Sequence, residues 1–133
     1  MNNDKTNSSQ YASDEITEGG IINDLTAKKC VACEGGMPAL NAKEIAMLQE
    51  RFSEPWEVVG DKKIQKNFTF KDFKEALSFT DQIGLLAEEE GHHPDIHLSY
   101  GKVKVELWTH AVNGLSENDF ILAAKIDTLI SNS

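Results

Sequence analysis

All four histidines of this 133-residue chain lie between positions 92 and 110, at His92, His93, His97 and His110. Histidine is the side chain that gains or loses a proton most readily near neutral pH, and neutral imidazole is also a common metal ligand. The clustering therefore indicates a proton-transfer site, a metal site, or an ordinary hairpin rich in imidazole. The backbone expected around each histidine separates these alternatives.

Pro94 restricts the backbone of the first two histidines. Steric clash with the proline ring disfavours helical backbone at the preceding residue, so we expect His92 and His93 in extended backbone just beyond a helix end. The spacing from His93 to His97 would suit two ligands on one helix face, but the intervening proline excludes that helix. Adjacent extended residues point to opposite sides, which is awkward for two ligands of one ion. A three-histidine zinc site stays open, and proton transfer fits this geometry better.

A β-hairpin is expected to bring the histidines together. Apolar residues alternate over 96–100 and again over 103–107, with Gly101 between the two segments as the turn. If the turn is centred on Gly101, His110 faces residues 92 and 93, and Cβ atoms of facing residues lie about 4.5–5.5 Å apart. The sequence therefore predicts three imidazoles at one end of the sheet.

The segment 70–90 has helical periodicity and should deliver an acidic end to the same place. Thr69 with Asp72 forms a possible cap pair, and Gly91 is the residue type favoured at a left-handed C-terminal cap. The run Glu88–Glu90 is unfavourable against the helix dipole. It indicates either a solvated helix end or a functional demand for acids there. The apolar face of this helix is expected to contain Phe73, Leu77, Ile83 and Ala87.

The other elements complete an α+β pattern. Asn41 is a candidate N-cap, with Glu44 three residues later, for a helix that ends near Phe52. Strand character over 56–59 and 63–70 flanks a turn signal at Gly60-Asp61, and a last helix is expected over 116–130. The order helix, two strands, helix, two strands, helix predicts a four-stranded antiparallel sheet with helices packed on one face.

Composition and charge limit the class of protein. The formal net charge of −9 argues against a nucleic-acid partner, which would need a basic patch. No apolar run approaches the length of a membrane span, and the N-terminus lacks the apolar core of a secretory signal, so we expect no membrane partner and a cytoplasmic location. We expect a flexible tail over 1–23, an irregular segment with a CxxC motif over 24–39, and a folded domain over 40–131.

The CxxC motif consists of Cys30 and Cys33. Such a motif can be a redox pair, half of a zinc site, or two unrelated thiols. The residues before it are polar and irregular, without the βαβ context of a thioredoxin-like site, and only the distant histidines could complete a zinc site. We therefore favour no catalytic role, with a redox-sensitive or metal-linked role as the alternative.

Three segments together resemble one known family. They are E-x-x-x-H-H-P over 88–94, V-x-V-x-L-x-T-H over 103–110, and GLSENDF over 114–120. The chain resembles the pterin-4a-carbinolamine dehydratases over about residues 40–130, and the HHP and TH motifs at this spacing are specific. The stretch from Cys30 to Leu40 is similar to an extension of bacterial-type members.

The resemblance implies a hydro-lyase that dehydrates 4a-hydroxytetrahydropterin (4a-carbinolamine) to quinonoid dihydropterin, recycling the pterin cofactor of aromatic amino acid hydroxylases. It implies a metal-free mechanism without a cofactor, a homodimer or homotetramer, and a functional link to such a hydroxylase. The family's catalytic histidines fall on His92, His93 and His110, and we assign Glu88, Asp119 and Pro94 to substrate binding.

The chemistry fits imidazole. A proton must reach the leaving hydroxyl while N5 gives up its own, and each such transfer contributes typically about 10²- to 10⁴-fold. We expect His93 and His110 to carry most of this work, with His92 assisting or binding the pterin edge, and His97 to be a bystander. Asp119 is also the third residue of a predicted helix cap at Ser116, which by itself accounts for an acid there.

Two positions depart from the family pattern, and one rival function stays open. Ile96 stands where many relatives have an aromatic residue, and Gly91 replaces an acid often found before the histidine pair. The rival is a non-catalytic binding or assembly module, or a transcriptional coactivator, on the same fold. Because a scaffold has no need for the three histidines, their presence favours the enzyme.

Overall fold

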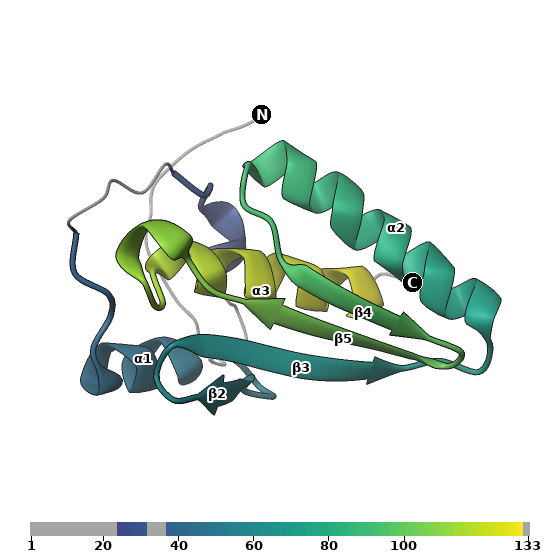
Figure 1. Ribbon diagram of the computed structural model, residues 1–133, viewed down its shortest axis with the longest axis horizontal. Helices are drawn as coiled ribbons and strands as arrows, with labels where there is room; N and C mark the ends of the chain where they lie inside the picture. Colours follow the sequence, from purple (N-terminus) through teal and green to yellow (C-terminus); the bar gives the residue numbers. More distant parts are fainter. Residues whose placement is uncertain (1–23, 32–36, 132–133) are drawn as a thin grey trace.

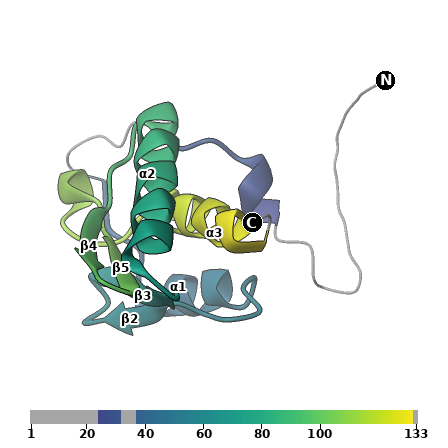
Figure 2. The same ribbon diagram turned by 90° about the vertical axis from the view of Figure 1, so that its right-hand side faces the viewer.

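A four-stranded antiparallel sheet carries the long helices on one face (Figures 1 and 2). The computed structural model describes residues 24–31 and 37–131. The elements in chain order are η2 (Asp24–Ala27), α1 (Ala42–Gln49), β2 (Glu57–Val59), β3 (Lys63–Thr69), α2 (Phe73–Glu90), β4 (Asp95–Ser99), β5 (Lys102–Leu107), η3 (His110–Val112) and α3 (Glu117–Ser131), where η marks a short 3-10 helix. The predicted α+β class and the helices on one face of the sheet are confirmed.

The sheet has the strand order β2-β3-β5-β4 and separates an apolar face from a polar one. Side chains alternate along each strand, and the register aligns the apolar positions of neighbouring strands, as where Ile64 pairs with Leu107. The core lies between this face and the helices α2 and α3. Its fully buried members on the sheet are Ile64, Val103, Val105 and Leu107.

Local signals account for the first three elements. Asn41 caps α1 in a reciprocal capping box with Glu44, as predicted. The helix ends at Gln49 rather than near Phe52, because the amides of Arg51 and Phe52 bond to carbonyls three residues back and tighten the chain. Gly60 and Asp61 both have positive φ, 59° and 56°, which is the geometry of a tight hairpin turn between β2 and β3.

Helix α2 ends at the predicted residue, but its N-cap and two of the residues on its buried face differ from the prediction. Gly91 is its left-handed C-cap, with φ 66°. The N-cap is Asp72, whose carboxylate accepts from the Glu75 amide, whereas Thr69 belongs to β3. Phe73 and Leu77 were wrongly placed on the inner face. They are exposed because Ala76 and Phe79 face the sheet in their place, together with Ile83 and Ala87.

The β4–β5 hairpin is one step away from the predicted register. Asp95 pairs with Glu106, so the turn is centred between Tyr100 and Gly101 rather than on Gly101 alone. Gly101 is required by close approach, because a Cβ there would lie 2.8 Å from the carbonyl oxygen of Phe70. The ladder ends at residues 95 and 107. His110 is therefore not opposite residues 92 and 93 in a strand, as predicted, but opens the 3-10 turn η3.

The segment 24–31 packs on the domain. Its 3-10 helix η2 lies against α3, and Leu25 is fully buried in the core. The predicted tail over 1–23 lies outside the described residues, as does Cys33. Within the described part of the chain, none of the helices combines the length and apolar character that crossing a bilayer demands.

Candidate active site

His92 and Asp119 form a buried pair at the end of the sheet where α2 stops and α3 begins. The His92 Nε2 atom lies 2.6 Å from Asp119 Oδ1, and the two side chains are 12% and 0% exposed. Gly91 sets this geometry, because its left-handed backbone turns the chain sharply out of α2 immediately before His92. Asp119 lies in the first turn of α3. Two segments distant in sequence thus hold one imidazole against one carboxylate.

The other oxygen of Asp119 is occupied by two donors. Oδ2 accepts the Thr109 hydroxyl at 2.8 Å and the Ser116 amide at 3.0 Å. The predicted cap partnership of Ser116 and Asp119 is therefore present in part, alongside the contact with His92. A carboxylate that accepts from these groups is also an acceptor for His92, so Nε2 carries its proton. The second ring nitrogen, Nδ1, is then the atom through which His92 can accept one.

His93 is paired with Glu88 on the surface. Its Nε2 lies 2.6 Å from Glu88 Oε2, and the side chains are 61% and 77% exposed. Glu88 belongs to the last turn of α2, and Pro94 keeps His93 out of helical backbone. The contact with Glu88 orients the His93 ring on the surface. The two adjacent histidines thus have separate acids, one buried and one exposed.

His110 lies at the start of a tight loop that follows β5. Thr109 and Gly114 pair as an isolated β-bridge that closes the loop around η3. The exposed His110 ring packs on Trp108, with ring centroids 3.8 Å apart. Thr109, its neighbour in the chain, bonds Asp119. The tertiary link between His110 and His92 therefore runs through Thr109 and Asp119 rather than across a strand pair.

His97 belongs to a different cluster on the polar face of the sheet. Its Nε2 lies 3.0 Å from Glu106, which also binds Lys63 at 2.8 Å and Lys104 at 3.5 Å. The hydrogen bond from Lys63, followed by that from His97, lowers the pKa of Glu106 to about 2 against the opposing effect of burial. This arrangement is an ion-pair cluster away from Asp119.

Two further residues bond to the site or its supports, and their contacts were not predicted from the sequence. They are Glu90 and Thr109. Glu90 is 8% exposed and not at a solvated helix end, because it accepts from the Cys30 amide at 2.9 Å and from Lys125 at 2.6 Å. Burial would raise the pKa of Glu90, but the Cys30 amide and Lys125 together hold that pKa below its usual value. For Thr109, the only signal was its place beside His110.

The Cys30 thiol is poorly suited to thiolate chemistry. Burial, reinforced by the negative charge of Glu90, raises its pKa to about 12. The thiol donates to the Asn118 carbonyl at 3.5 Å. Nucleophiles and metal ligands are thiolates, so this environment gives a redox or metal-linked role no support. Among the described residues, no three histidine, cysteine, aspartate or glutamate side chains are grouped so as to hold a metal ion.

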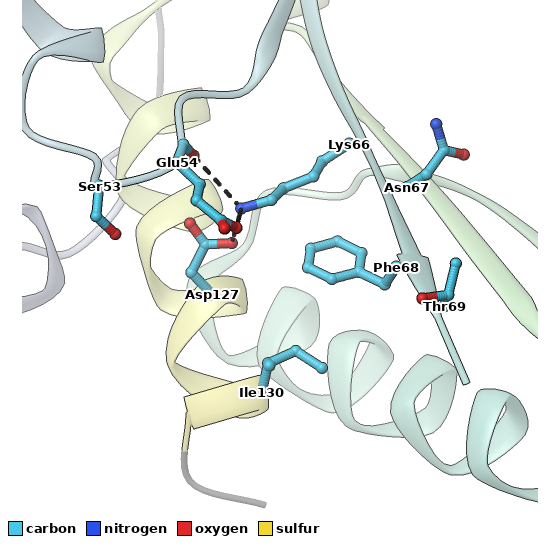
Figure 3. Close-up of a pocket in the computed structure, with 8 residues that line it drawn as sticks. All are labelled: Ser53, Glu54, Lys66, Asn67, Phe68, Thr69, Asp127 and Ile130. Atoms are coloured by element: carbon cyan, nitrogen blue, oxygen red, sulfur yellow. Dashed lines mark hydrogen bonds and ion pairs between the residues drawn. The ribbon is translucent and has the colours of Figure 1, made fainter. Parts of the chain in front are cut away.

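A separate hollow lies between β3 and the second half of α3 (Figure 3). Its volume is about 340 Å³, and it contains none of the predicted site residues. Lys66 reaches across it to Asp127 at 3.0 Å. Burial raises the pKa of Asp127 despite this contact. Lys66 also lies 3.9 Å from Glu54, so the charged groups of the hollow form their own ion-pair cluster, apart from the histidines.

Comparison with known families agrees with the motif positions. The family model described as pterin 4 alpha carbinolamine dehydratase matches residues 38–129, nearly all of the described domain. The chain belongs to this family. As family members named as dehydratases are hydro-lyases, the predicted enzyme class is confirmed at the level of the family.

Relatives named as dehydratases of this family match along almost their whole length. One from Alkaliphilus metalliredigens is 52% identical over 106 residues, which are 80% of this chain and 96% of the relative. One from Rickettsia canadensis is 47% identical over 106 residues, 80% of this chain and 97% of the relative.

Two solved structures share the fold of this family member. A transcriptional coactivator/pterin dehydratase from Brucella melitensis superposes with a TM-score of 0.64 at 35% identity, covering 68% of this chain and 97% of the other. A pterin dehydratase-like protein identified as a RuBisCO assembly factor in the alpha-carboxysome gives a TM-score of 0.52 at 26% identity, covering 61% and 95%. The fold therefore occurs both in a protein described as a coactivator/dehydratase and in one described as an assembly factor.

Proposed function

We propose that this protein dehydrates 4a-hydroxytetrahydropterin to quinonoid dihydropterin and water by histidine acid–base catalysis. Family membership supports the substrate class. The observation that carries the proposal is the pairing of two consecutive histidines with two different acids, His92 with buried Asp119 and His93 with exposed Glu88. A module that only binds a partner has no need for this arrangement of imidazoles and carboxylates.

The reaction needs one acid and one base. The C4a–O bond breaks as the hydroxyl receives a proton and leaves as water, while the N5 lone pair forms the C4a=N5 double bond and N5 loses its proton. Glu88 bonds Nε2 of His93 and orients the ring, and in this scheme His93 delivers the proton to the leaving hydroxyl. His110 is exposed and its ring packs on Trp108, and in this scheme it accepts the N5 proton.

His92 has a binding role in this scheme. Its Nε2 proton is committed to Asp119, which orients the ring and leaves Nδ1 as an acceptor for a donor on the pterin edge. Asp119 thus acts on the substrate through His92, while Glu88 lies on the surface and can also accept from the amino group of the pterin. Pro94 completes the site by holding the backbone of His93 extended.

We propose that the catalytic domain spans residues 40–131, after a tail over 1–23 and the CxxC segment over 24–39. We propose a cytoplasmic homodimer or homotetramer that serves an aromatic amino acid hydroxylase. Size-exclusion chromatography with light scattering measures the oligomeric state directly.

The decisive experiment is a direct dehydration assay on freshly generated carbinolamine, followed by the absorbance of quinonoid dihydropterin. We expect the protein at catalytic concentration to accelerate the reaction well above the spontaneous rate. A rate equal to the spontaneous one would contradict the proposal and favour the alternative, a non-catalytic binding, assembly or coactivator module. The solved assembly factor of the same fold gives that alternative its specific support.

A further inference from the structure

The segment before the catalytic domain is bonded to the two elements that carry the His92–Asp119 pair. We call residues 24–31 the N-terminal strap. At its start, Leu25 is fully buried in the core and η2 packs on α3. At its end, residues 30 and 31 bond the last residue of α2 and the first turn of α3. The strap therefore spans the junction at which the two catalytic segments meet.

On the α3 side, the strap is held by Asn118. The Asn118 side chain makes a two-point contact with the backbone of Val31, accepting its amide at 3.0 Å and donating to its carbonyl at 2.5 Å. The Asn118 carbonyl accepts from the Cys30 thiol at 3.5 Å. Asn118 is 5% exposed and is the immediate neighbour of Asp119. Any movement of the strap is thus transmitted to the residue beside the carboxylate.

On the α2 side, the strap is held by Glu90. This carboxylate accepts the Cys30 amide on one oxygen and Lys125 of α3 on the other, at 2.9 and 2.6 Å. The Glu90 side chain is 4% exposed, and Lys125 is 16% exposed. Only Gly91 separates Glu90 from His92. A buried carboxylate with two donors is strongly held, because losing either donor leaves a desolvated oxygen without its hydrogen bond.

From these contacts we propose that the N-terminal strap positions the His92–Asp119 pair, with Glu90 and Asn118 as its anchoring residues. The inference rests on the proposed function for its catalytic consequence, but not for its effect on the geometry of His92. The strap locks the end of α2 to the start of α3. The 2.6 Å contact depends on that relative position, since its two residues come from those two ends. Glu90 and Asn118 are positioning residues, because they act through the pair.

Val31 offers a test that leaves the core untouched. Its side chain is 70% exposed, so only its backbone is used in the contact with Asn118. Val31→Pro removes the amide donor, and Val31→Ala retains it as the matched control. A second pair is Glu90→Gln, which removes the buried charge, with the exposed neighbour Glu89→Gln as control. All four are made in the full chain.

Two readouts separate the positioning role from the enzyme activity. Nitrogen-15 NMR of the imidazoles reports the tautomer of His92 and the exchange rate of its Nε2 proton. The dehydration assay reports turnover on carbinolamine. The Trp56 indole proton, which bonds Asp127 at 3.2 Å, is the internal reference for the fold.

We expect Val31→Pro and Glu90→Gln to mix the His92 tautomers, speed exchange of its ring proton, and lower kcat about fivefold to tenfold. The two controls should match the wild type, and the Trp56 signal should be unchanged in all. An unchanged His92 spectrum in both test variants would overturn the proposal, whatever happens to turnover. If the wild type fails to dehydrate carbinolamine but its His92 spectrum responds to Val31→Pro, the proposed function fails and the positioning role stands.

Discussion

Asp119 joins His92 to Thr109 through its two carboxylate oxygens, 2.6 Å from the imidazole Nε2 and 2.8 Å from the hydroxyl. One fully buried side chain thus connects the segment after α2 to the segment after β5. His93 and His110 are the chain neighbours of the two residues that Asp119 joins.

Asp119→Asn should preserve the shape of the site and reverse its hydrogen bonding. The amide oxygen would keep the Thr109 and Ser116 donors, so its NH₂ would face His92 and favour the opposite tautomer. Because a wrong tautomer removes the acceptor offered to substrate, we expect kcat/KM to fall by about 10²-fold or more. Steady-state kinetics and imidazole NMR measure both effects, and an Nε2–H tautomer retained in the variant would contradict this account.

His93→Ala should reduce carbinolamine dehydration by about 10²-fold or more with the fold intact, because it removes a proton donor from the transition state. His97→Ala is the matched control. His97 contacts Glu106 on the polar face of the sheet, so its loss should leave turnover nearly unchanged. The dehydration assay compares the two variants. A large loss in the control, or none in His93→Ala, would refute the division into catalytic and bystander histidines.

Thr109→Val should destabilise the domain while nearly preserving its shape. The variant lacks the hydroxyl that donates to a fully buried carboxylate, and leaving such a group with one donor fewer costs about 1–3 kcal/mol. Thr69→Val, on an exposed position of β3, should change the free energy of unfolding by less than about 0.5 kcal/mol. Urea denaturation measures both, and equal stabilities for the two variants would show that the hydroxyl is not needed.

Glu106 should make stability fall in acid. Its folded-state pKa is lowered to about 2, first by Lys63 and then by His97, against burial. The stabilisation is therefore fully present above the unfolded-state pKa near 4.5, and it is lost as pH falls toward 2. Glu106→Gln should lower the free energy of unfolding by about 2 kcal/mol at pH 7, discounted for residual solvent screening.

The measurement for Glu106 is the pH dependence of urea denaturation between pH 7 and 2. The difference between Glu106→Gln and the wild type should shrink over the acid range and vanish near its end. Glu89→Gln, at an exposed position, serves as the control and should follow the wild type throughout. A difference that is constant with pH would assign the effect to packing rather than to ionisation.

Local signals were sufficient for most of the fold. The capping box of Asn41 and Glu44, the turn at Gly60-Asp61 and the C-cap at Gly91 were all predicted and observed. Each depends on a few consecutive residues whose backbone preferences are steric. Alternation and helical periodicity supplied the element order, and that order leads to the antiparallel sheet. The inner face of α2 was partly wrong because Phe73 and Leu77 are apolar without being buried.

From the sequence, the residues of the candidate site could be predicted, but their contacts with one another could not. Motif resemblance selected His92, His93, His110, Glu88 and Asp119 as a set. It did not say which acid faces which histidine, and the assumed strand pairing of His110 was wrong because β5 ends at Leu107 and a 3-10 turn follows. An error of one residue at the turn moves every facing pair, so register cannot supply distances.

The sequence alone determined the order of the elements, which family the motifs resemble, and that His92 and His93 follow an acidic helix end. Only the tertiary structure decided that Asp119 bonds His92, that Glu88 bonds His93, and that Glu90 is buried and bonds the N-terminal strap. The reason is physical. Caps and turns are satisfied within a few residues, whereas a buried charge is satisfied by whichever donors packing brings to it from distant parts of the chain.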